Sequence, residues 1–196
     1  MDIMNFWWLL IPASYVLGTF PTAHIVAGFV GHDPTSEGSG NPGATNVYRV
    51  AGAKAGLIVL LGDLMKGLIP SLVCLLVDGR ILGLVAGLAA LLGHVAPITR
   101  KLNGGKGVAT LTGFSVALYP FVVLALFVVW IPLMRLFRKA SIGSLVTVIL
   151  LPIGVLIMPD TCWYEVVIIG AASFVVTLRH HENIKRLFKG EEQAID

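Results

Sequence analysis

Long apolar segments alternate with short polar ones along this chain. The apolar segments cover residues 7–30, 55–77, 81–98, 108–137, 142–158 and 163–178. A helix needs about 17–25 residues to cross a bilayer, and all but one of these segments are close to that length. The composition agrees, since 56% of the residues are hydrophobic and only 13% are charged, against roughly a quarter charged in soluble domains. The pattern predicts an all-α integral membrane protein.

The segment 108–137 is too long for a single crossing. As one helix, with a rise of about 1.5 Å per residue, it would measure roughly 45 Å, against a hydrocarbon core of about 30 Å. Tyr119 and Pro120 lie near its middle, and a residue that precedes proline disfavours the helical conformation. We therefore expect a tight turn there, after a short helix over 108–118, which brings the prediction to seven transmembrane helices.

The positions of the basic residues predict the orientation. With seven helices and the N-terminus outside, the 14 Lys and Arg residues fall in cytoplasmic loops and the C-terminal tail, except Arg80 and Lys66. Basic residues are enriched in cytoplasmic loops, so this arrangement is the favoured one. The C-terminus is then cytoplasmic, and residues 1–196 form a single polytopic domain. Its polar cytoplasmic face consists of the loops 31–54 and 99–107 and the tail 179–196.

The first polar loop contains a glycine-rich stretch over residues 38–49, reading GSGNPGATNVYR. Its hydroxyl and amide side chains, its exposed backbone and Arg49 are suited to binding phosphate oxygens. Ser39 is the one hydroxyl between glycines, and no acid is present. The alternative is a flexible connection between two helices.

The second polar loop ends in GGKG at residues 104–107, directly before an apolar helix. Glycines around Lys106 at a helix N-terminus favour anion binding, although the spacing is not that of a P-loop. Taken alone the motif is weak evidence, but it lies on the same predicted membrane face as the first one.

Two further polar groups lie near the cytoplasmic ends of later helices. His180 and Asn183 are three residues apart, so they share a face if the helix continues. Ser141 is expected to cap a helix, or alternatively to contact a phosphate there. The chain has 2 cysteines and shows no pattern of ligands for a metal. We expect neither a metal nor a cofactor, and no nucleic-acid partner.

Asp63 and Lys66 lie inside an apolar segment, three residues apart. Charges within a membrane segment are costly and usually functional. We expect the two side chains to pair and to fix helix packing. The alternative function is a small-anion transporter that uses Asp63 and Lys66 as its coupling pair.

With these motifs assembled, the chain resembles the bacterial acyl-phosphate:glycerol-3-phosphate acyltransferase family, PlsY, over nearly its whole length. The resemblance rests on residues 38–49, on DLMKG at 63–67, GHVAP at 93–97, GGKG at 104–107, SIGS at 141–144 and HHEN at 180–183. It implies the transfer of a long acyl chain from acyl phosphate to the sn-1 hydroxyl of glycerol 3-phosphate, which yields lysophosphatidic acid and phosphate. This is the first step of phospholipid synthesis, placed by the resemblance in the bacterial inner membrane with the active site on the cytoplasmic face.

The resemblance and the motifs together give the expected site. The catalytic residues are Ser39, Arg49, Lys106 and His180, where His180 rather than His181 takes the place of the family histidine. The residues expected to bind substrate are Gly40, Asn41, Gly43, Thr45, Asn46, Gly104, Gly105, Gly107, Ser141 and Asn183. The partners are glycerol 3-phosphate, a long-chain acyl phosphate and membrane lipid.

The group that accepts the hydroxyl proton is left open by the sequence. One alternative is His180 as general base, oriented by Asn183. The other, which we favour, is a phosphate oxygen of the acyl donor. A coenzyme A-dependent acyltransferase remains a second alternative, but the His-x4-Asp motif of such enzymes does not occur in this sequence.

Overall fold

A computed structural model of the chain describes residues 6–195, and every regular element in that range is helical. The elements are a 3-10 helix (η2, Trp7–Leu9), α1 (Leu10–Gly18), α2 (Thr22–Gly28), α3 (Ala44–Val95), a 3-10 helix (η3, Ile98–Arg100), α4 (Val108–Leu118), α5 (Pro120–Phe137), α6 (Ala140–Leu156), α7 (Trp163–Leu178) and α8 (His181–Lys189). The predicted all-α class is therefore confirmed. The chain divides into two compact units, one up to Leu118 and one from Tyr119 onward.

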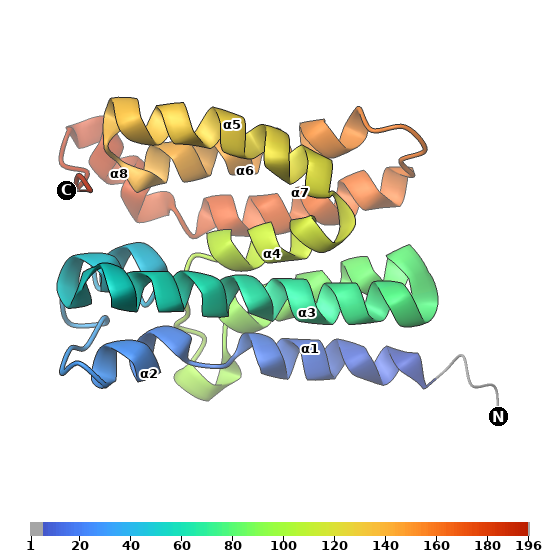
Figure 1. The fold of residues 1–196 in the computed structure, drawn as a ribbon, viewed down its shortest axis with the longest axis horizontal. Coiled ribbons are helices and arrows are strands. Elements are labelled where there is room, and N and C mark those ends of the chain that lie inside the picture. Colours follow the sequence, from blue (N-terminus) through green and yellow to red (C-terminus); the bar gives the residue numbers. More distant parts are fainter. Residues whose placement is uncertain (1–5, 196) are drawn as a thin grey trace. The chain divides into compact units, whose positions relative to one another are not determined.

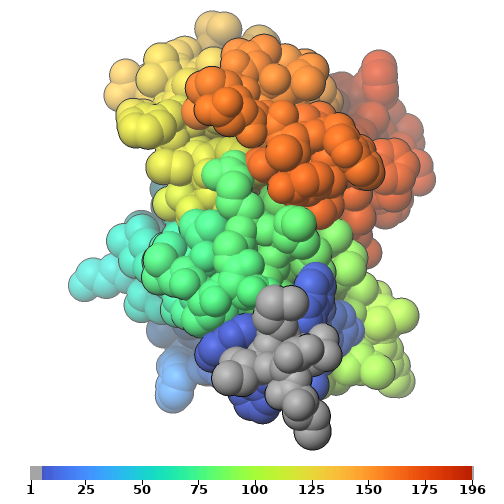
Figure 2. Space-filling view, turned by 90° about the vertical axis from the view of Figure 1, so that its right-hand side faces the viewer, coloured from blue at the N-terminus to red at the C-terminus, as the bar shows by residue number. Residues whose placement is uncertain are grey.

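Helix α3 is interrupted twice by glycine. Gly52 has φ +86° and Gly79 has φ +84°, and Asp78 beside it is also non-helical, with φ −147° and ψ 19°. Positive φ is easy only for glycine, so these positions allow the chain to turn sharply between helical segments. The break at Asp78–Gly79 lies between the two apolar segments that the sequence separates at 78–80. The green part of α3, which includes this break, lies at the surface in Figure 2.

Glycines bring the helices of the first unit into close backbone contact. A Cβ atom on Gly18 would overlap the carbonyl oxygen of Ala90, and one on Gly67 would overlap that of Thr110. α1 therefore packs directly on the last part of α3, and α4 packs on its middle part. In Figure 1, α1 and α2 lie along one side of α3 and α4 lies along the other. Small residues at helix crossings are typical of proteins packed within a membrane.

The second unit begins at the predicted break. Tyr119 has φ −138° and ψ 55°, and Pro120 is the first residue of α5, the position that proline favours because its missing N–H has no intrahelical acceptor. α6 packs against both α5 and α7. The Tyr119 hydroxyl donates to Glu165 Oε2 at 2.6 Å, and Glu165 is only 1% exposed. This bond ties the start of α5 to the first turn of α7.

Within residues 6–195, three helical stretches are long and apolar enough to cross a membrane, namely residues 7–28, 44–100 and 120–137. The break at Asp78–Gly79 divides the second of these into two parts. The shorter apolar helices α4, α6 and α7 have 11, 17 and 16 residues. The count of seven crossings, the orientation of the termini and the single polytopic domain stay predictions.

Candidate active site

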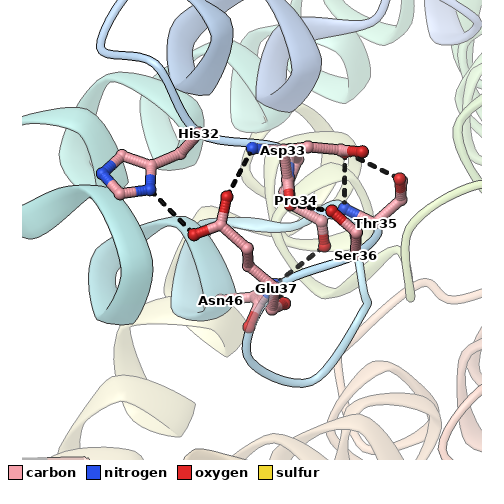
Figure 3. Close-up of polar contacts among 7 residues, drawn as sticks. All are labelled: His32, Asp33, Pro34, Thr35, Ser36, Glu37 and Asn46. Atoms are coloured by element: carbon pink, nitrogen blue, oxygen red, sulfur yellow. Dashed lines mark hydrogen bonds and ion pairs between the residues drawn. The ribbon is translucent and has the colours of Figure 1, made fainter.

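Asn46 organises the glycine-rich loop that precedes α3 (Figure 3). Its side chain is 1% exposed, and its Oδ1 accepts a hydrogen bond from the Ser39 backbone N–H at 2.7 Å. Its Nδ2 donates to the backbone carbonyls of Pro34 and Glu37 at 2.9 and 3.0 Å. Both polar atoms of Asn46 thus bond to the loop itself. This favours a loop-positioning role over the direct substrate contact that the sequence predicted.

The acids upstream of the loop bond to their neighbours. Glu37 pairs with His32 Nδ1 at 2.8 Å and accepts the Asp33 backbone N–H at 2.9 Å. Asp33 accepts from both the hydroxyl and the backbone N–H of Thr35, at 2.7 and 2.9 Å. The bonds from Thr35 lower the pKa of Asp33, and the bonds from Asp33 and His32 lower the pKa of Glu37. Both carboxylates are therefore ionised at neutral pH and contribute to the shape of the loop (Figure 3).

Two glycine N–H groups of this loop are bonded within it. Gly40 donates to the Glu37 carbonyl at 3.1 Å, and Gly43 donates to the Asn41 carbonyl at 2.9 Å. These two N–H groups therefore have acceptors within the loop, and the binding of substrate by Gly40 and Gly43 stays a prediction. The glycines provide turns: Gly38 and Gly40 have φ +60° and +69°. The side chains of Ser39, Asn41 and Thr45 are half-buried along the loop.

Arg49 lies on a short helical segment, residues 44–51, that ends at the Gly52 break. This segment folds back on the following one, because a Cβ on Gly56 would lie 2.8 Å from the Tyr48 Cα. Val47 is 0% exposed and belongs to an apolar cluster formed by Ala23, Ala27, Ala55 and Val59. Burial of Val47 fixes the segment on α2 and α3. The half-buried Arg49 is thus attached to a packed element, which fixes the position of its backbone.

The GGKG loop is pinned to the end of α3 by its first two glycines. The Gly104 N–H donates to the Val95 carbonyl at 3.1 Å, and the Gly105 N–H donates to the His94 carbonyl at 3.2 Å. Both N–H groups thus have backbone acceptors at the end of α3, and substrate binding by Gly104 and Gly105 stays a prediction. α4 begins at Val108, directly after the loop, and the first N–H groups of a helix have no intrahelical acceptor. An anion at this end of α4 would meet those groups and the half-buried Lys106.

A mostly apolar cleft of about 640 Å³ lies beside the loop that follows α3. It is lined by Val16, Leu17, Thr19, Phe20, Pro21, His24, Thr99 and Arg100. The loop is tied to α1 by Tyr15, whose hydroxyl donates to the Ala96 carbonyl at 2.8 Å and accepts the Ile98 N–H at 3.1 Å. Arg100 makes one side of the cleft cationic, and it belongs to the same loop as Lys106.

The polar residues of the second unit gather at the start of α8. His180 is 3% exposed, and its Nδ1 donates to the Val176 carbonyl at 2.8 Å. A carbonyl oxygen can only accept, so this bond places the proton on Nδ1 and makes Nε2 the basic nitrogen of the neutral ring. Asn183, 4% exposed, is buried at the same end of α8, while His181 is exposed. The assignment of the family histidine to His180 rather than His181 stays a prediction.

Glu192 was not predicted from the sequence. It is 8% exposed and accepts from Asn183 Nδ2 at 2.6 Å and from Arg186 Nε at 2.8 Å. Burial raises the pKa of Glu192, but the nearby Ser141 hydroxyl and the bonds from Asn183 and Arg186 outweigh it and hold the pKa below its ordinary value. Glu192 is therefore an anion at neutral pH, and its carboxylate orients the side chain of Asn183. The sequence signal is Gly190, which ends α8 with φ +74° and turns the tail back.

The three comparisons with known proteins converge. Residues 8–190 match a family model described as glycerol-3-phosphate acyltransferase. The chain belongs to this family. It is 40% identical to the glycerol-3-phosphate acyltransferase of Shewanella loihica, over 95% of this chain and 91% of that protein. It is also 40% identical to that of Syntrophotalea carbinolica, over 96% of this chain and 97% of that protein.

The fold matches two crystal structures of PlsY (YgiH), described as an integral membrane glycerol 3-phosphate acyltransferase. The glycerol 3-phosphate form superposes with a TM-score of 0.92 at 33% identity, over 97% of this chain and 96% of that one. The lysophosphatidic acid form gives a TM-score of 0.89 at 33% identity, over 97% of this chain and 95% of that one. The chain is thus an integral membrane protein of an acyltransferase family, as predicted.

The predicted site residues are divided between the two units of the structure. Ser39 is bonded to Asn46 in the first unit, and Asn183 is bonded to Glu192 in the second. That the two units contribute to one active site stays a prediction. Residues 6–195 contain no group of three or more His, Cys, Asp or Glu side chains that could hold a metal.

Proposed function

We propose that the chain transfers a long acyl group from acyl phosphate to the sn-1 hydroxyl of glycerol 3-phosphate on the cytoplasmic face of a bacterial inner membrane. The observation that carries the proposal is the 0.92 TM-score to the glycerol 3-phosphate form of PlsY at 33% identity. Both proposed substrates bear phosphate. The first unit carries Arg49 on the short helix that follows the glycine-rich loop and Lys106 on the GGKG loop, and hydrogen bonds fix the backbone of both loops.

Arg49 and Ser39 are proposed to hold one phosphate. A guanidinium binds two phosphate oxygens in a fork, and the short helix 44–51 restrains it. The Ser39 hydroxyl, half-buried at the turn that Asn46 fixes, adds a donor. Asn41 and Thr45 supply further donors along the same loop. Ser39 is a ligand in this proposal and not a nucleophile.

Lys106 and the N-terminus of α4 are proposed to hold the other phosphate. The ammonium and the helix N-terminus both favour an anion. Gly107 has φ +91°, and a residue with a side chain would strain the backbone there. The glycine thus allows the loop to enter α4 directly after Lys106.

The chemical step breaks one bond and forms another at the acyl carbon. The sn-1 oxygen of glycerol 3-phosphate attacks the carbonyl carbon of the acyl phosphate, and the bond from that carbon to the phosphate oxygen breaks. The hydroxyl proton passes to a phosphate oxygen of the donor and leaves with inorganic phosphate. The cations and the α4 N-terminus stabilise the negative charge that develops on the carbonyl oxygen.

His180 and Asn183 are proposed to position the acceptor. Asn183 Oδ1 is buried and has no hydrogen-bond partner among residues 6–195, so it can accept from a substrate hydroxyl. Ser141 is a neighbouring hydroxyl of the same cluster, at the start of α6. His180 Nε2 is the basic nitrogen of its ring and is the alternative proton acceptor. The acyl chain is proposed to lie in the apolar cleft beside Leu17 and Phe20.

The deciding experiment measures inorganic phosphate released from acyl phosphate by the purified protein in lipid nanodiscs. Release is expected only when glycerol 3-phosphate is present, and lysophosphatidic acid should form in equal amount. Acyl-CoA as donor should give no product, and product from acyl-CoA would overturn the proposed donor. In proteoliposomes the protein should move no phosphate across the bilayer, which separates it from a small-anion transporter. Loss of all turnover in His180→Ala with glycerol 3-phosphate binding intact would make His180 the base.

A further inference from the structure

A buried charged cluster lies directly under the GGKG loop. Asp63, Lys66 and His94 are 3%, 5% and 6% exposed. Lys66 Nζ donates to Asp63 Oδ1 at 2.6 Å, and His94 Nδ1 lies 3.7 Å from the same oxygen. The pairing of Asp63 with Lys66 confirms the prediction from their spacing. The contact with His94, which is 31 positions further along the chain, was not predicted.

His94 touches the GGKG loop with both its ring and its backbone. A Cβ atom on Gly105 would overlap His94 Nε2 and lie 2.9 Å from its Cε1, so the glycine sits against the imidazole. The carbonyls of His94 and Val95 accept the Gly105 and Gly104 N–H groups. The imidazole is therefore clamped between Asp63 on one side and the loop on the other.

Asp63 also reaches the helix that follows the loop. Its backbone carbonyl accepts the Thr110 hydroxyl at 2.9 Å, and Thr110 is 0% exposed in the first turn of α4. Both ends of the GGKG loop are thus connected to Asp63 on α3, one through His94 and the other through Thr110. Lys106 lies between them.

Stability alone does not account for such a cluster. Two charges removed from water lose hydration, and a buried ion pair is often no more stabilising than apolar residues of similar volume. What a buried pair does provide is one arrangement of its neighbours, because any displacement leaves a charge unpaired at a high cost. A buried ion pair is therefore well suited to hold the GGKG loop in a single position.

We propose that His94, held by the Asp63–Lys66 pair, is a positioning residue for the GGKG loop. It fixes the position of the loop relative to α3, and so places Lys106 and the α4 N-terminus to bind the phosphate of glycerol 3-phosphate. The inference rests on the proposed function in that Lys106 holds one of the two phosphates, and it assigns that phosphate to glycerol 3-phosphate. His94 acts through the loop and does not touch the substrate.

The first test is a double-mutant cycle between His94 and Gly105 on the KM for glycerol 3-phosphate. His94→Ala and Gly105→Ala are each expected to raise KM by about ten- to a hundredfold, the range for a binding group displaced by about 1 Å. At saturating glycerol 3-phosphate, kcat should fall by a smaller factor than KM rises; some fall is expected because Lys106 and the α4 N-terminus also stabilise the developing charge. In Gly105→Ala the new methyl group pushes on the imidazole, and His94→Ala removes that clash. The double variant should therefore have a KM well below the product of the two single effects.

Independent effects in this cycle would overturn the proposal, and so would a fall in kcat with KM unchanged in His94→Ala. His94→Gln, which keeps a side chain under Gly105, should retain most of the affinity. His181→Ala is the matched control, because His181 is an exposed histidine outside this cluster and its loss should leave KM unchanged. If His94→Ala is not recovered folded, Lys66→Met with Asp63→Leu replaces the ion pair by apolar side chains. This pair of changes should keep the thermal midpoint and still raise KM.

The second test repeats His94→Ala in a Lys106→Ala background. If His94 acts through Lys106, its loss should add less than threefold to the KM of the Lys106→Ala enzyme. A full additional effect would show that His94 acts by another route and would overturn the proposal. If Lys106→Ala alone leaves the KM for glycerol 3-phosphate unchanged, Lys106 does not bind that phosphate and this inference is overturned. The proposed function fails only if Lys106→Ala also leaves the KM for acyl phosphate and kcat unchanged.

Discussion

Replacing Asn46 by alanine tests whether the glycine-rich loop is held from within. The substitution removes three hydrogen bonds to the backbone of Ser39, Pro34 and Glu37. Each is worth about 0.5–1.5 kcal/mol, so the folded loop should lose about 3 kcal/mol relative to its open forms. At 1.36 kcal/mol per tenfold change, kcat/KM should fall by up to roughly a hundredfold. The loss should be local, since the helices on either side of the loop keep their packing.

The assay combines steady-state kinetics of phosphate release with limited proteolysis of residues 31–43. In Asn46→Ala the loop should become cleavable while the thermal midpoint of the helical core moves by only a few degrees. Thr35→Ala is the control, because Thr35 is exposed and its hydroxyl bonds only Asp33. If Asn46→Ala lost activity while the loop stayed as resistant as in the wild type, Asn46 would be a substrate ligand and our reasoning would be wrong.

Three further outcomes are expected. Glu192→Gln should lower the thermal midpoint at pH 7, because it weakens the bonds to Asn183 and Arg186. Since the pKa of Glu192 is lowered in the fold, the stability that Glu192 contributes is complete above its unfolded pKa of about 4.3 and is lost as the pH falls through the folded value. The thermal midpoints of the variant and the wild type should therefore converge in acid. Arg49→Lys should lower kcat/KM by about tenfold or more, since a lysine cannot form the two-pronged contact, and an unchanged value would argue against Arg49 as a phosphate ligand. Leu17→Trp should narrow the cleft and lower kcat/KM for long-chain but not short-chain acyl phosphate. The control Leu61→Trp, at an exposed position outside the cleft, should leave kcat/KM unchanged for both donors.

Local rules predicted much of the fold. The break at Tyr119–Pro120 follows from the restriction that proline imposes on its neighbour. The turn at Asp78–Gly79 follows from a polar residue and a glycine between two apolar segments. The Asp63–Lys66 contact follows from a three-residue spacing on a helix. Each of these rules involves residues that are close in sequence.

The parts that could not be predicted depend on contacts between distant residues. The role of Asn46 depends on where the loop places the carbonyls of Pro34 and Glu37. The bonds of the Gly104 and Gly105 N–H groups to the carbonyls of Val95 and His94, at the end of α3, were not predicted from the sequence. A glycine-rich stretch predicts that the backbone is accessible, and it does not tell which acceptor the backbone meets. Glu192 was missed for the same reason, since its partners become visible only when the tail turns back after Gly190.

The two loops of the first unit differ in how early they can form during synthesis. The side-chain bonds of Asn46 join residues at most 12 positions apart, so its loop can close as soon as that part of the chain has left the ribosome. The GGKG loop depends on Asp63, whose bond to Thr110 spans 47 positions. Contacts between residues close in sequence form faster than those between distant ones. We therefore expect the Arg49 side of the phosphate-binding region to be shaped first, and the Lys106 side to be completed only after α4 has entered the bilayer.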